Sequence, residues 1–171
     1  MDAAQVLEEA YRRIRELVHQ AADGIGPDSL TYRPEPGANS IAWLIWHLTR
    51  IQDDHLASLA GVPQLWEDRE WATTTGVDRP ADALGQGDGP AEVAAIRPNS
   101  PEGLVRYHDA VMARSLEYVA GLTRRDLDEI VDRSYDPPVT RGVRLVSVLS
   151  DNIQHAGQAR YVRGIVDRLG I

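Results

Sequence analysis

The sequence predicts an all-α protein, a four-helix bundle with a long crossover loop between its second and third helices. Apolar residues recur at spacings of three and four along four long segments, which is the pattern of amphipathic helices. No segment shows the strict alternation expected of a strand. The 171 residues, of which 43% are apolar and 26% charged, suit one globular domain spanning residues 1–171 rather than a disordered chain.

Each long helix is predicted where an apolar stripe begins at a capping residue and ends at glycine. Side-chain oxygens of Ser, Thr, Asn and Asp accept the free backbone N–H groups of a first turn, and glycine readily adopts the conformation that follows a last turn. The predicted helices cover residues 2–22, 40–60, 101–120 and 140–169, and a shorter one runs from Thr123 to Val131.

A long irregular connection, residues 62–99, separates the second and third helices. It contains four prolines and several glycines, with only a short turn indicated between Trp66 and Trp71. Loops of this length inside a compact domain are usually functional or partly mobile, and the tryptophans need a surface on which to bury. We therefore expect this connection to cover one end of the bundle, beside a functional site.

Composition excludes several classes of function. The formal charge is −8, and no cationic cluster exceeds a pair of arginines, which argues against nucleic-acid and membrane partners. The absence of cysteine excludes disulfides, thiolate metal ligands and a cysteine nucleophile. No stretch has the pattern of a signal peptide or a membrane span. We expect a cytoplasmic protein that acts on a small molecule, with a monomer or a homodimer both open.

Polar residues interrupt the apolar stripes of two helices. Asp151 and His155 occupy positions on the last helix where the pattern calls for Leu or Val, and they lie one turn apart on the same face. His47 interrupts the second helix in the same way. Metal sites in bundles are built from inward-facing side chains on facing helices, and two imidazoles with one carboxylate leave open positions on a divalent ion.

The same three residues are also compatible with roles that need no metal. A buried histidine is commonly a hydrogen-bonded core residue, and Asp151 and His155 could form an intrahelical ion pair. Asp54, on the second helix, is a candidate to orient a ligand histidine or to act as a general base.

The remaining histidines have no such support from the pattern. His55 lies eight residues after His47 and is rotated off its face, so we expect it to be solvated. His19 and His108 flank apolar positions and are expected at the surface.

Two motifs resemble the DinB-like superfamily. The segment WLIWHL at 43–48 carries a W-x3-H motif, and DNIQHAGQ at 151–158, followed by Y-x-R-G at 161–164, carries an acid-x3-H-x-G-Q motif. The acid at position 151 resembles the branch that contains mycothiol-dependent maleylpyruvate isomerase, where the commonest branch has histidine. The resemblance covers the whole domain. It implies a divalent metal, zinc or nickel, held by His47, Asp151 and His155.

The resemblance also implies an activity. Members with known activities use the metal to activate a low-molecular-weight thiol or a water. The leading hypothesis is a metal-dependent enzyme that activates a thiol such as mycothiol for S-transfer or isomerisation, with Arg160 and Arg163 as candidates to hold carboxylates. The alternatives are a metal-dependent hydrolase and a non-catalytic metal-binding protein, with an iron oxygenase ranked below them.

Overall fold

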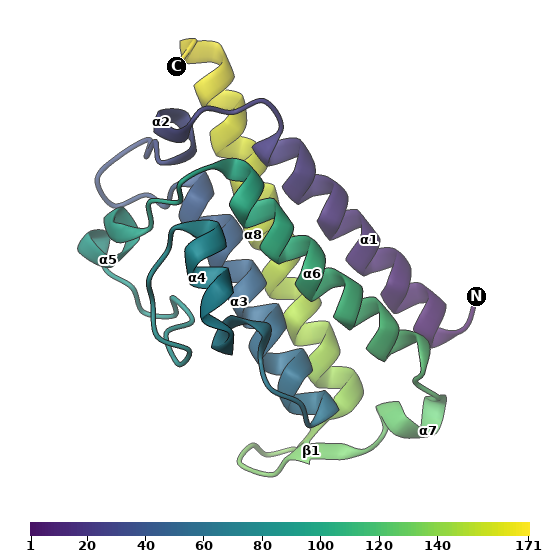
Figure 1. Cartoon of the computed structure of the whole chain (residues 1–171). Coiled ribbons are helices and arrows are strands. Elements are labelled where there is room, and N and C mark those ends of the chain that lie inside the picture. Colours follow the sequence, from purple (N-terminus) through teal and green to yellow (C-terminus); the bar gives the residue numbers. More distant parts are fainter.

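The four predicted long helices form a bundle in the computed structural model, which describes residues 1–171 (Figure 1). Each packs chiefly on two neighbours, so that the order around the bundle is α1, α6, α3, α8. In Figure 1 α1 and α8 run in one direction, and α3 and α6 in the other. The crossover therefore joins two parallel helices and must return along their length, which explains why it is long. The bounds are α1 Ala3–Ala22, α3 Ile41–Ala60, α6 Pro101–Ala120 and α8 Arg141–Leu169.

Local capping explains where these helices begin and end. The hydroxyls of Ser40, Ser100 and Thr140 each accept a backbone N–H from the first turn of α3, α6 and α8. Helices α3 and α8 end at Gly61 and Gly170, which have φ values of +69° and +67°. No boundary of a long helix differs from its predicted position by more than one residue.

The connections contain more regular structure than the sequence predicts. The helix expected from Thr123 to Val131 stops at Leu127, and the next residues pair as an antiparallel hairpin of β1 and β2, although no strand was expected. Strands of two or three residues are too short to show an alternating pattern. The shorter elements are α2 Pro27–Leu30, η1 Leu65–Glu67, α4 Arg69–Thr75, α5 Pro90–Ala95, α7 Arg124–Leu127, β1 Ile130–Asp132 and β2 Val139–Thr140.

A buried polar network attaches the crossover to α3. The carboxylate of Asp53 accepts hydrogen bonds from the backbone N–H groups of Leu65 and Trp66, at 3.0 and 2.9 Å. The guanidinium of Arg50 is fully buried, lies 3.5 Å from that carboxylate and donates to the carbonyl of Ala81. Because burying a charge is costly unless it is paired and hydrogen-bonded, these contacts fix both ends of the segment between Leu65 and Ala81. None of the helices is long and apolar enough to cross a membrane.

Candidate metal centre

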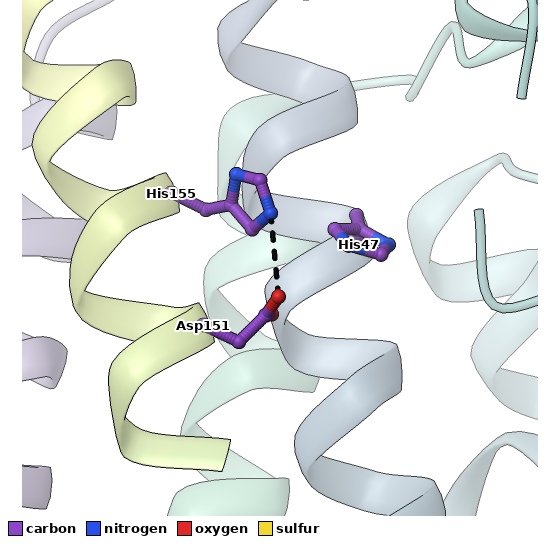
Figure 2. Close-up of side chains that lie close together, drawn as sticks. All are labelled: His47, Asp151 and His155. Atoms are coloured by element: carbon purple, nitrogen blue, oxygen red, sulfur yellow. Dashed lines mark ion pairs between the residues drawn. The ribbon is translucent and has the colours of Figure 1, made fainter. Parts of the chain in front are cut away.

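The three predicted ligand residues lie together between α3 and α8. Figure 2 shows His47 reaching from α3 toward Asp151 and His155 on α8. One ligand atom from each lies within 4.8 Å of the other two. Nε2 of His155 is 3.5 Å from Oδ1 of Asp151, and two ligands of a tetrahedral ion with bonds of 2.0–2.2 Å lie about 3.4 Å apart. The cluster therefore fits a divalent metal, although this distance alone also satisfies an intrahelical ion pair.

Hydrogen bonds at Nδ1 leave Nε2 of both imidazoles available as ligand atoms. Nδ1 of His47 lies 2.6 Å from the carbonyl oxygen of Leu84, and Nδ1 of His155 lies 2.9 Å from Oε1 of Gln158. Because these oxygens only accept hydrogen bonds, each Nδ1 carries a proton, so Nε2 is the nitrogen that can bind a metal once the imidazole is neutral. Histidines that bind metals characteristically donate their other N–H in this way.

One oxygen of Asp151 has no partner. Its Oδ2 atom is buried and makes no hydrogen bond, while Oδ1 faces His155. A buried acceptor without a partner costs roughly 1–3 kcal/mol, and more when it is charged. A cation between the three side chains would remove that cost. This unpartnered oxygen, beside two imidazoles, favours a metal site over a simple ion pair.

The protonation states of the cluster suit a cation. Burial lowers the pKa of His47, so that this imidazole is neutral at pH 7. Burial raises the pKa of Asp151, but the hydrogen bond and charge of His155 outweigh it and leave the pKa below its usual value. The hydrogen bond from His155 to Asp151 raises the pKa of His155, and a metal would compete with that proton. With a divalent ion the cluster would carry a net charge of about +1.

The crossover packs directly on the histidine from α3. The ring of Trp43 stacks on His47 with centroids 4.6 Å apart, and its indole N–H donates to the carboxylate of Asp88 at 2.9 Å. Gly85 has a φ of +91°, and a Cβ at that position would lie 2.9 Å from Nδ1 of His47. Residues 84–88, called here the 84–88 segment, therefore cover this side of the site and allow no side chain at Gly85.

The tryptophans of the crossover do not take part in this cover. Trp66 packs against Trp46 and Tyr107, and Trp71 packs against Tyr107. The 84–88 segment thus covers the candidate site, whereas the two tryptophans do not and anchor the crossover to the bundle instead.

A pocket of about 210 Å³ lies beside the ligands. His55 lines it, with a side chain that is 29% exposed, so His55 is only partly solvated rather than on an open surface as expected. Two side chains eight residues apart on an α-helix differ in direction by only about 80° around the helix axis. The pocket is wide enough to be lined by both His47 and His55. The lining residues are His47, Ile51, His55, Gln86, Ser147, Val148 and Asp151.

Two further expectations for polar residues are wrong. His108 is fully buried rather than at the surface, and its Nδ1 lies 3.0 Å from Oγ1 of Thr49. Asp54 does not orient His47, since Nδ1 of His47 faces the carbonyl of Leu84 and Oδ1 of Asp54 accepts a hydrogen bond from the amide of Gln64 at 2.8 Å. His19 is partly exposed and pairs with a carboxylate on α6.

The candidate arginines lie at the end of α1, away from the pocket. Arg160 donates to the backbone carbonyl of Gln20. Arg163 donates to the carbonyls of Ala21 and Asp23 and pairs with Asp167. Both side chains therefore hold α8 against the end of α1.

The fold and the site define a four-helix-bundle protein with a candidate metal centre of two histidines and one aspartate. Residues 10–159 match the family model of the DinB superfamily, and the chain belongs to this superfamily. It is also similar to a solved structure described as a conserved protein from Enterococcus faecalis, with 29% identity and a TM-score of 0.88. That match covers 95% of this chain and 96% of the other. No curated protein matches the chain.

Proposed function

We propose that this protein is a divalent-metal-dependent enzyme that activates a low-molecular-weight thiol for S-transfer or isomerisation. Zinc or nickel would be held by Nε2 of His47, Nε2 of His155 and the carboxylate of Asp151. The unpartnered, buried Oδ2 atom of Asp151 carries this proposal. When bound, a divalent ion lowers the pKa of a thiol or water at an open position, so that a nucleophile is present at neutral pH.

The surroundings of the cluster favour catalysis over a purely structural site. The protein supplies three ligands, whereas structural zinc sites usually have four. The adjoining pocket of about 210 Å³ can admit the reactive end of a small substrate. The 84–88 segment and Trp43 shield His47 from water, which strengthens electrostatic interactions there.

The thiol would come from outside the protein, because the chain has no cysteine. Mycothiol is the first thiol to test, since an acid at position 151 resembles the branch that includes the mycothiol-dependent isomerase. Maleylpyruvate and simple electrophiles are the corresponding substrates to test.

Two measurements test the proposal. Elemental analysis of the purified protein should find zinc or nickel in the wild type and much less in His47→Ala, with circular dichroism confirming that the variant is folded. Turnover should then be assayed with mycothiol, bacillithiol, glutathione or no thiol, on metal-loaded and chelated protein. Turnover that requires both metal and thiol supports the proposal. Metal-dependent turnover without a thiol would indicate a hydrolase, and bound metal without any turnover would indicate a non-catalytic metal-binding protein.

A further inference from the structure

His55 is the one titratable side chain of the pocket that lies outside the ligand cluster. The pocket is lined by His47 and Asp151, which belong to the cluster, and by His55 on the next turns of α3. The rest of the lining is uncharged. A group in the pocket that must gain or lose a proton therefore has His55 as its only partner besides the ligands themselves.

The ring of His55 has a carboxylate beside one of its nitrogens. Its Nδ1 lies 3.6 Å from Oδ2 of Asp54, and the other oxygen of Asp54 accepts a hydrogen bond from Gln64 at 2.8 Å. Gln64 in turn accepts a hydrogen bond from the buried guanidinium of Arg50 at 2.9 Å. With Nδ1 facing a carboxylate, Nε2 on the opposite edge of the ring is left for a group in the pocket. At 3.6 Å the contact is an ion pair rather than a hydrogen bond, and the carboxylate stabilises the protonated ring that forms when the imidazole accepts a proton.

We propose that His55 is the proton-transfer residue of this pocket. The inference rests on the proposed function. Nε2 of His55 takes the proton from the S–H group of a thiol in the pocket, and the sulfur forms a bond to the electrophilic carbon of the substrate. The bond from that carbon to its leaving group breaks, the leaving group takes the electron pair, and protonated His55 returns the proton to it.

Burial favours the neutral, proton-accepting form of His55, against the pull of two nearby carboxylates. Burial has the largest effect and lowers its pKa. Asp54 on the same helix and Asp151 on α8 raise the pKa, whereas Arg144 on α8 lowers it. Arg144 is itself paired with Asp132 at 2.9 Å. The net effect is a lowered pKa, so His55 is a base at pH 7.

Proton release on thiol binding tests this role without requiring turnover. Calorimetric titration of zinc-loaded protein with 2-mercaptoethanol, in two buffers of different ionisation enthalpy, gives the number of protons released to solution. The comparison is wild type against His55→Gln and His55→Asn, whose amides hydrogen-bond but accept no proton at pH 7. His19→Gln is the matched control, because His19 is a partly exposed histidine on α1, outside the pocket.

We expect the wild type and His19→Gln to release fewer protons per bound thiol than either His55 variant, because the negative charge of the bound thiolate raises the pKa of His55 and lets it keep part of the proton. All four proteins should hold equal amounts of zinc by elemental analysis. Equal proton release would overturn the role of His55 while leaving thiol activation intact. Loss of zinc from both His55 variants would also overturn it, because His55 would then be a ligand. Failure of the zinc-loaded wild type to bind any thiol would overturn the proposed function itself, and this inference with it.

Discussion

Replacing Gly85 by alanine should weaken metal binding from outside the ligand set. At a φ of +91° an alanine strains the backbone by roughly 1–3 kcal/mol. Its Cβ would also lie 2.9 Å from Nδ1 of His47 and from a ring carbon of Trp46, closer than atoms of this kind approach. Either the imidazole or the 84–88 segment must move, and the 2.6 Å hydrogen bond from His47 to Leu84 is lost. Loss of such a supporting bond typically lowers metal affinity by about 10–100-fold.

Gly87→Ala separates the two effects of this substitution. Gly87 has a φ of +84°, and a Cβ there would have no neighbour within 4 Å, so it carries the backbone strain without the contact. Urea unfolding should show that Gly87→Ala loses roughly 1–3 kcal/mol of stability and that Gly85→Ala loses at least as much. Zinc affinity, measured by competition with a fluorescent chelator, should fall only in Gly85→Ala. Equal zinc affinity in the two folded variants would refute the reasoning that the 84–88 segment positions His47.

Three further predictions concern the ligands, the core and the bound metal. Asp151→Ala should lower zinc affinity by more than about 100-fold, because even residues that only support a ligand contribute about 10–100-fold. Circular dichroism should show an intact helical fold. Complete unfolding of this variant would mean that Asp151 has a structural role instead. Burial lowers the pKa of His108 from 6.5 to about 4, so the unfolded chain binds more protons between those values. The free energy of unfolding, measured with urea, should therefore be unaffected by His108 above pH 6.5 and fall by about 3 kcal/mol as the pH drops to 4. The fall should be smaller in His108→Gln. Zinc at 100 times its Kd should add about 2.7 kcal/mol to the free energy of unfolding. In a calorimetric scan this raises Tm by roughly 5–10 °C relative to chelated protein, and an unchanged Tm would argue against a metal site.

The sequence predicts the long helices well because their signals are local. Ser40 and Gly61 mark the ends of α3 without reference to the rest of the chain. Helix α4 is different, because it is stabilised by packing on α6. A Cβ at Gly103 would lie 2.3 Å from the carbonyl oxygen of Thr74, so the two helices approach closely only because position 103 is glycine. Such a contact between distant segments leaves no periodic pattern, and the crossover was therefore expected to be irregular.

The cluster of candidate ligands could be predicted because polar side chains interrupted apolar stripes, but the supporting groups could not. The carbonyl of Leu84 orients His47, and a backbone carbonyl has no signature in a sequence. His108 was misplaced although a signal existed, since it lies on the stripe of Leu104 and Val111 and its core position follows from that spacing. His55 was not expected at the site because it is rotated away from His47 on the helix. One pocket is nevertheless wide enough to be lined by both side chains.

The two sides of the metal centre have different supports, and this predicts where metal removal should act. Asp151 and His155 belong to one long helix, whereas His47 is held by the 84–88 segment, which has little regular structure. Within that segment the N–H of Asp88 donates to the carbonyl of Gly85 at 3.1 Å. Zinc binding fixes the ring of His47 and, through the bond from Nδ1 to Leu84, should also restrain this turn.

Hydrogen exchange measures that restraint directly. Adding zinc to chelated protein should slow exchange at Asp88, because local opening of the 84–88 segment would then require the loss of a contact to a fixed ligand. The amide of Trp66 is the control, since it lies in the same crossover but bonds to the carboxylate of Asp53 at 2.9 Å, away from the ligands. Its exchange should change much less. Equal slowing at both amides would mean that zinc stabilises the whole bundle rather than this segment, and no slowing at either would mean that the 84–88 segment is independent of the metal.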